Sequence, residues 1–273
     1  MAIVNPPETA PPPLQLDADQ IQVLADLEAL NRQLVETDEV PLESDWHRMA
    51  INLLIEIIRY HFRDRKDFFA GGNMFIYFST DQARTREFRG PDFFLVKGAD
   101  RDRLRRWWAV WEENGLYPNV IIELLSPSTA HVDRTTKKQL YEGTFRTSEY
   151  YCYNPATNQL EGWRLDQEYR YQPLVPDHRG WLRSEQLDLY LGTWTGRFLE
   201  AQAVWLRFFD PEGRLVPTYA EAAQSQATAA ETRAAEAETR AAEAETRAET
   251  AEAEAERLRQ ELEALRRGSA GQS

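Results

Sequence analysis

Five polar side chains stand at positions and spacings that indicate chemistry. Asp92 directly precedes the apolar run FFLV, and Glu123 interrupts the apolar run VIIELL. Asp133, Lys137 and Tyr141 follow at equal intervals of one helical turn, so they line one face of a helix. Burying a carboxylate is costly unless it is paired or bound to a metal. Glu123 therefore needs a partner, and a divalent cation is one such partner.

These residue types suit the hydrolysis of a phosphodiester. Water must be made more acidic and the charge on the phosphate must be offset, and a Mg²⁺ ion held by one or two carboxylates does both. We expect Asp92 and Glu123 to supply the oxygen ligands. Lys137 would orient the water or help to deprotonate it, and would stabilise charge in the transition state. Lys138 points about 100° away on the same helix and is the second choice.

Each of these signals also has a structural explanation. An aspartate after a proline is common in turns, and a lone acid in an apolar strand can form an ion pair with Arg or Lys. Asp133 is a good helix N-cap, and Tyr141 can serve as a packing residue. A single imidazole such as His47 is more often a helix-surface or packing residue. We therefore treat His47, Asp133 and Tyr141 as positions that could touch the site.

The elements around these residues predict one α/β or α+β domain over residues 41–219. A wide apolar stripe from Trp46 to Phe62 is typical of an amphipathic helix. The run from Asn119 to Leu125 is apolar enough for a strand covered on both faces. A helix over 133–142 follows, and strand-like segments with hairpin signals continue to the end of the domain. The order helix, strands, helix, strands is typical of one such domain.

Taken together, the motifs resemble a known family. PDFFLV, VIIELLSPST, D-x-x-x-K-x-x-x-Y and EYYCYNP are similar to the Uma-two family of restriction-endonuclease-like proteins, a branch of the PD-(D/E)xK nuclease superfamily. The resemblance covers residues 41–219 and implies a restriction-endonuclease-like core, a mixed β-sheet flanked by helices, with Mg²⁺ at the acids and Mn²⁺ as a substitute. Asp92 matches the PD aspartate and Glu123 the strand acid. Three further residues occupy family-like positions: His47, Asp133 and Tyr141.

The sequence departs from the superfamily pattern at one position. Leu125 stands where the E-x-K pattern has its lysine, and the resemblance implies that Lys137 on the following helix replaces it. Two functional hypotheses follow. The first is a Mg²⁺-dependent endonuclease that cleaves DNA with activated water. The second is a catalytically inactive interaction module that assembles through its C-terminal coiled coil; a third keeps the metal but acts on RNA or another phosphate ester.

The segment 97–117 joins several arginines to three tryptophans. Such a segment could contact a phosphate backbone and stack on a base. Alternatively, the tryptophans pack on the domain while the arginines stay solvated. Ahead of the domain, we expect residues 1–14 to be a disordered Pro-rich tail and residues 15–40 to be a helical extension. That extension either binds a partner or packs on the core.

Residues 220–267 repeat AEAETRA with a period of seven, which predicts a heptad-repeat helix that forms a coiled coil. The alternative is a lone helix supported by its own charge pairs. Because the seam is rich in alanine, it buries little area when helices pair. The Leu258–Leu265 end should therefore contribute most to pairing. Residues 268–273 are expected to be a disordered tail.

Composition limits the remaining possibilities. The net charge of −13 argues against a general nucleic-acid coat but leaves room for an enzyme with a local basic groove. A single cysteine, Cys152, excludes an internal disulfide and a Cys-cluster zinc site. The N-terminus lacks the features of a secretory signal, and no apolar run is long enough for a membrane span. We expect a cytoplasmic protein without membrane contact that acts on DNA and forms a homo-oligomer through its core, its coiled coil or both.

Overall fold

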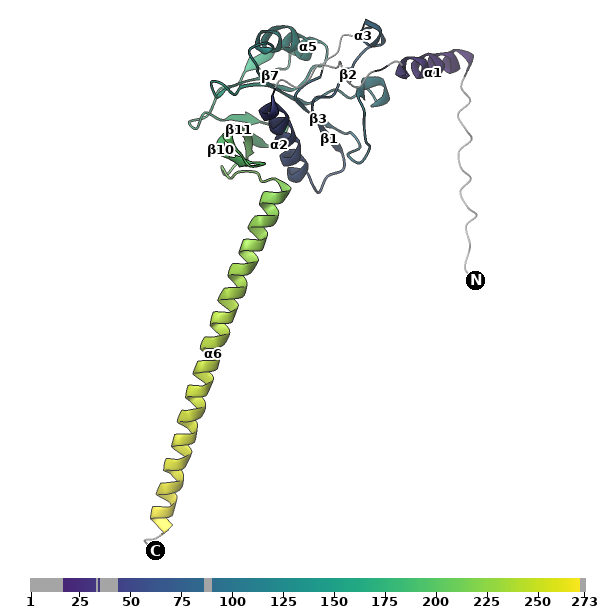
Figure 1. Ribbon diagram of the computed structural model, residues 1–273. Coiled ribbons are helices and arrows are strands. Elements are labelled where there is room, and N and C mark those ends of the chain that lie inside the picture. The colour runs from purple at the N-terminus through teal and green to yellow at the C-terminus, as the bar shows by residue number, and fades with distance from the viewer. Residues whose placement is uncertain (1–16, 33, 35–43, 86–89, 271–273) are drawn as a thin grey trace, which may run out of the picture. The chain divides into compact units, whose positions relative to one another are not determined.

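The computed structural model describes residues 17–32, 34, 44–85 and 90–270 of the 273-residue chain (Figure 1). By its contacts the chain divides into two compact units, residues 1–216 and 217–273, which are taken separately below. The predicted tail at 1–14 and the last residues of the chain lie outside the described residues, as do residues 35–40 of the predicted extension. None of the described helices is both long and apolar enough to cross a membrane.

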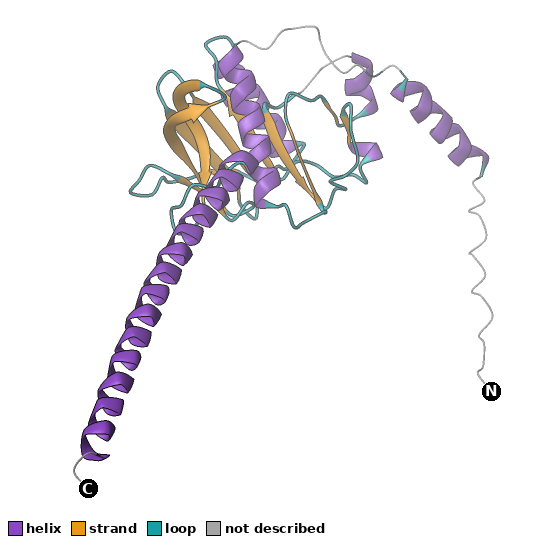
Figure 2. Ribbon diagram, turned by 60° about the horizontal axis from the view of Figure 1, so that its bottom comes forward, coloured by secondary structure: helices purple, strands orange, loops and turns teal. Residues whose placement is uncertain are grey.

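The first unit is built on a mixed six-stranded sheet, as the sequence predicts (Figure 2). In spatial order its strands are β1 (Phe68–Gly71), β3 (Phe93–Lys97), β5 (Val120–Leu124), β6 (Glu149–Asn154), β7 (Gln159–Leu165) and β8 (Tyr171–Pro173). Strands β5 and β6 are parallel, and every other neighbouring pair is antiparallel. A parallel pair needs a long crossover, and a helical segment between β5 and β6 supplies it.

Two smaller sheets complete the strands of this unit. The first is antiparallel and has the order β11-β10-β9; its strands are β9 (Leu182–Ser184), β10 (Leu189–Phe198) and β11 (Ala201–Phe209). The second is a short parallel pair of β2 (Ile76–Tyr77) and β4 (Trp108–Ala109). The sequence pattern predicts strand segments in several of these places. It does not show that they form sheets separate from the main one.

The helices of the unit differ in length and in role. They are α1 (Ala18–Asn31), α2 (Asp45–His61), α3 (Thr80–Thr85), a 3-10 turn η1 (Val110–Glu112), and the crossover segment α4 (Ala130–Val132), η2 (Asp133–Lys137) and α5 (Lys138–Gly143). The backbone N–H of His47 donates to the Ser44 hydroxyl at 3.1 Å, so Ser44 caps α2. The middle of the apolar stripe of α2 is buried and its ends at Trp46 and Phe62 are partly buried, as its spacing predicts.

The main sheet has a hydrophobic core on each face. One core joins α2 and the β9–β11 sheet to Val120, Ile122 and Leu124 of β5. The other joins Ile121 of β5 to α5 and to the short β2–β4 pair. Because side chains alternate along a strand, odd-numbered residues of β5 face the crossover helix. Glu123 therefore points toward the crossover helix and not toward α2.

The segment 97–117 packs on the sheet and corrects one expectation. Trp108 is fully buried in the second core, in agreement with the structural alternative. Arg105 is not solvated: only 2% of its side chain is exposed, and it forms a bidentate pair with Glu113 at 2.8 and 2.9 Å. Its guanidinium also lies over the rings of Phe69 and Trp108. A buried carboxylate and two aromatic faces hold this arginine, so it belongs to the scaffold.

Helix α1 packs on the unit at its C-terminal end and is exposed nearer its start. Near its C-terminal end Leu30 is buried, and Asn31 accepts a hydrogen bond from the Trp111 indole at 3.1 Å. That end packs on the unit. Earlier in the helix, Ile21, Val23 and Leu24 are exposed by 56%, 58% and 47%.

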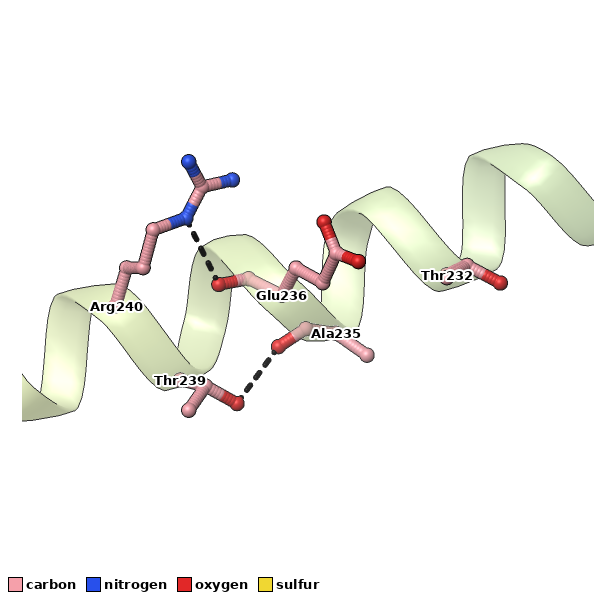
Figure 3. Close-up of a pocket in the computed structure, with 5 residues that line it drawn as sticks. All are labelled: Thr232, Ala235, Glu236, Thr239 and Arg240. Atoms are coloured by element: carbon pink, nitrogen blue, oxygen red, sulfur yellow. Dashed lines mark hydrogen bonds between the residues drawn. The ribbon is translucent and has the colours of Figure 1, made fainter.

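The second unit consists of one helix, α6 (Tyr219–Ala270). It begins one residue before the predicted range and continues three residues beyond it, so residues 268–270 are helical. Thr218 and Glu221 form a reciprocal capping box at its start, with hydrogen bonds of 2.8 and 3.1 Å. Figure 3 shows one repeat: Arg240 and Thr239 donate to the carbonyls of the preceding turn, and all the labelled residues lie on the exposed surface of one helix.

Candidate active site

Asp92 and Glu123 meet where β3 begins and β5 ends. The antiparallel register pairs Phe93 with Ile122, so the residues before and after them are also neighbours. The Leu124 N–H donates to Asp92 Oδ2 at 2.7 Å, and the Asp92 N–H lies 3.4 Å from Glu123 Oε2. Two acids that are far apart in sequence therefore share one edge of the sheet.

Glu123 is almost completely buried, with 1% of its surface exposed. Its Oε1 atom accepts a hydrogen bond from the Tyr141 hydroxyl at 2.9 Å and lies 3.1 Å from Lys137 Nζ. Both partners come from the crossover segment that packs on this face of the sheet. The structure thus brings Glu123, Lys137 and Tyr141 together.

The crossover segment contains a π-helical turn at Asp133–Lys137. Asp133 Oδ1 lies 2.7 Å from Lys137 Nζ, and the Tyr150 hydroxyl donates to the Asp133 carbonyl at 2.9 Å. Asp133 has helical backbone angles and lies inside the helical segment, so the N-cap interpretation is wrong. Wide turns of this kind are frequent at functional sites because they redirect side chains.

The two neighbouring lysines point to different partners. Lys137 contacts Glu123 and Asp133, whereas Lys138 Nζ lies 4.1 Å from the centre of the Trp163 ring. A cation over an aromatic face is stabilised there and is directed away from the acids. The geometry therefore favours Lys137 over Lys138 as the lysine of the cluster.

His47 lies closer to the acids than its residue type alone would suggest. Its Nε2 atom is 2.8 Å from Asp92 Oδ1, and the residue is 8% exposed. The capped first turn of α2 holds its backbone in place through Ser44. His47 therefore contacts one of the two acids expected to bind the cation. Asp92 is held from both sides, by an imidazole and by the Leu124 N–H.

Three residues of the cluster have shifted pKa values: Glu123, Lys137 and Tyr141. Burial raises the pKa of Glu123 to about 8; Lys137 opposes this rise, and the nearby Asp92 and Asp133 add to it. Burial lowers the pKa of Lys137, but Glu123, Asp133 and Asp92 outweigh burial and hold that pKa above its usual value. Burial and Glu123 also keep the pKa of Tyr141 well above its usual range. Lys137 therefore stays an ammonium ion, and Tyr141 stays a hydrogen-bond donor.

The oxygen atoms of Asp92 and Glu123 suit a hard divalent cation. Within the described part of the chain, no group of three or more His, Cys, Asp and Glu residues could hold a metal ion by itself. Mg²⁺ does not need such a cage, since it commonly binds one or two carboxylates and fills its other positions with water and phosphate oxygens. Each carboxylate has about four acceptor positions. The protein contacts given above leave acceptor positions unused at both acids.

Sequence reasoning missed several residues that shape the site. Tyr150 holds the π-helical turn, and the Leu124 N–H orients Asp92. Arg134 pairs with Glu161 at 2.6 Å and ties the crossover segment to β7. A tyrosine among the aromatic residues of EYYCY carries no signal of such a role. No sequence pattern indicates which backbone N–H will orient an acid such as Asp92.

Comparison with known proteins places the chain in a family. No curated protein was found to match it. A crystal structure described as a "putative nuclease belonging to DUF820" from Anabaena variabilis ATCC 29413 is similar with 15% identity and a TM-score of 0.36, over 50% of this chain and 74% of that one. The family model Uma2, described as "Putative restriction endonuclease", matches residues 24–202, so the match starts and ends earlier than the 41–219 expected. Since the match covers more than half of the sequence, the chain belongs to the Uma2 (Uma-two) family.

Proposed function

We propose that this protein is a Mg²⁺-dependent endonuclease that hydrolyses phosphodiester bonds of DNA. One observation carries the proposal: Asp92 and Glu123 meet at one edge of the sheet with the Lys137 ammonium 3.1 Å from Glu123. Membership in the Uma2 family supports a nuclease at a general level. We also propose DNA as the substrate, Mg²⁺ as the metal and the cytoplasm as the location.

Each residue of the cluster has a separate role in this proposal. Asp92 and Glu123 hold the cation, which would lower the pKa of water and offset charge on the phosphate. His47 and the Leu124 N–H fix the orientation of Asp92. Tyr141 fixes one oxygen of Glu123. Lys137 supplies positive charge next to the acids, where negative charge grows in the transition state.

The test is cleavage of supercoiled plasmid in Mg²⁺ or Mn²⁺, with EDTA as the metal-free control. Asp92→Asn and Glu123→Gln should each lower the rate by more than the roughly 10–100-fold that loss of an outer hydrogen bond to a metal ligand costs. The matched control is Asp64→Asn, because the Asp64 side chain is 88% exposed. Wild-type cleavage rates in both site variants would contradict the proposal. A parallel assay with RNA tests the substrate.

A second candidate function is a catalytically inactive interaction module. The observation that favours it is Leu125, which is 3% exposed and occupies the position of the strand lysine. In such a module the ion pairs of Lys137 would be purely structural. The protein would then fold normally, would bind no Mn²⁺ at millimolar concentration and would leave plasmid intact.

A further inference from the structure

Helix α6 carries a regular seam along its whole described length. Its members alternate at the a and d positions of a heptad: Ala223, Ala227, Ala230, Ala234, Ala237, Ala241, Ala244, Ala248, Ala251, Ala255, Leu258 and Leu262. Leu258 and Leu262 are exposed by 49% and 54%. Alanine buries little area, so the seam alone gives weak pairing and does not define an orientation.

The charges beside the seam are ordered, and their order reverses once. After Gln226, the g positions are Arg233, Arg240, Arg247 and then Glu254 and Glu261. The e positions are Glu231, Glu238, Glu245, Glu252 and then Arg259. Both series change sign at the same place along the helix. Residues at e and g set the partner and the orientation in coiled coils.

In a parallel pair of helices, each g residue faces the e residue of the following heptad on the partner. With both chains in the same register, every such pair of two charged residues is of opposite charge: Arg233 with Glu238, Arg240 with Glu245, Arg247 with Glu252, and Glu254 with Arg259. We infer that α6 binds α6 of a second copy of this chain as a parallel, in-register, two-stranded coiled coil.

The sign reversal disfavours the other arrangements. A slip of one heptad places Arg247 opposite Arg259. Antiparallel helices bring g against g and e against e, and the registers of greatest overlap place arginine against arginine and glutamate against glutamate near the centre. Like charges at these positions are destabilising. The pairing does not depend on nuclease activity and can be tested without it.

Ion pairs between residues of the same helix do not explain the order of charges at the e and g positions. Arg247 lies 3.5 Å from Glu243, and the other ion pairs within the described part of α6 are longer, at 3.8 and 3.9 Å. All of these side chains are at least 60% exposed, and such pairs contribute little. A lone helix needs only Glu and Arg one turn apart. It gives no reason for the e and g series to reverse together.

The first test reverses one charge at a time in the full-length chain. In Arg247→Glu, two attractive pairs become repulsive in the dimer, and the same holds for Glu252→Arg. Each change should raise the dissociation constant by about tenfold in sedimentation equilibrium at low salt. An equimolar mixture of the two variants should recover wild-type affinity, because both pairs are again of opposite charge in the heterodimer.

The second test reads orientation and register directly. Ala244→Cys places a thiol at a d position, which meets its own copy only in a parallel, in-register pair. The control is Ala242→Cys at a b position, and the native Cys152 is buried in both variants. We expect disulfide-linked dimer in Ala244→Cys and little in the control. Equal crosslinking of the two variants, or sedimentation that Arg247→Glu leaves unchanged, would overturn the inference.

Discussion

Glu123 is a buried acid whose carboxyl is destabilised in its charged form. Its pKa rises from 4.5 to about 8, first because of burial and then because of Asp92 and Asp133. The folded state therefore binds a proton more tightly than the unfolded state. The contribution of Glu123 to stability is fully present below pH 4.5 and is lost as the pH rises through about 8. Without a cation, the charged Glu123 opposes folding at alkaline pH.

The first prediction follows from this balance. Glu123→Gln removes the charge and keeps an acceptor for Tyr141. In EDTA at pH 8.5, we expect the variant to melt at a higher temperature than the wild type, with a smaller difference at pH 5. Thermal unfolding by circular dichroism measures this. A variant that melts lower at alkaline pH would show that the charge of Glu123 stabilises the metal-free fold.

The second prediction separates the two lysines of the crossover segment. Lys137→Met removes the ammonium that contacts Glu123 and Asp133, so plasmid cleavage should be lost. Mn²⁺ binding should persist, because Lys137 competes with the cation for the oxygens of Glu123. Lys138→Met removes only the contact with the Trp163 ring and should keep most of the activity. Greater loss in Lys138→Met would assign the catalytic role to that lysine.

At the scale of whole elements, a second buried acid joins the main sheet to the β9–β11 sheet. Glu149 of β6 is fully buried, and its oxygens accept hydrogen bonds from Arg164, from the Tyr151 hydroxyl, and from the Ser184 hydroxyl of β9 and the Glu185 N–H that follows it. These contacts fix how the two sheets pack. Neither motif nor spacing marks Glu149 for this role in the sequence.

The third prediction concerns this junction. Glu149→Gln leaves the Arg164 guanidinium without its buried partner, and we expect a loss of about 1–3 kcal/mol in the free energy of unfolding. The control is Glu185→Gln, which removes a more exposed partner of the same arginine, at a cost below about 1 kcal/mol. Urea denaturation measures both. Equal losses would mean that the burial of Glu149 adds nothing.

The local sequence pattern is sufficient to predict some elements and insufficient to predict others. The apolar run around Glu123 predicts a covered strand, and the apolar stripe of α2 predicts a packed helix. Both predictions succeed because the spacing of apolar residues along the chain reflects burial. The π-helical turn and the contact of His47 with Asp92 depend on how distant elements meet, so no local pattern reveals them. The burial of Arg105 is hidden from the sequence for the same reason, since its partner Glu113 is brought near only by the folded loop.

At the scale of the whole molecule, the net charge of −13 shapes any encounter with DNA. Part of that charge lies on α6, and the scaffold role of Arg105 removes one candidate phosphate contact from the segment 97–117. The sequence revealed this charge and the long helix directly. The assembly state depends on a second chain, and only the order of charges along α6 indicates it.

The fourth prediction follows from this charge. A protein with many phosphate contacts loses about 10³–10⁵ in affinity between roughly 50 and 200 mM salt. We expect a loss of less than about 10² here, because the net charge is −13 and salt also screens the repulsion between protein and DNA. The KM for plasmid across that salt range is the measurement. A steep loss would instead indicate many phosphate contacts.

The central claim is that Asp92 and Glu123 together bind one divalent cation. Calorimetric titration of the full-length protein with Mn²⁺ at pH 8 tests it most directly, with Asp92→Asn, Glu123→Gln and the exposed Asp64→Asn as a matched set. We predict one site per chain in the wild type and in Asp64→Asn, and no measurable binding in either site variant. A wild-type protein that takes up no Mn²⁺ at millimolar concentration, or site variants that bind it equally well, would contradict the account.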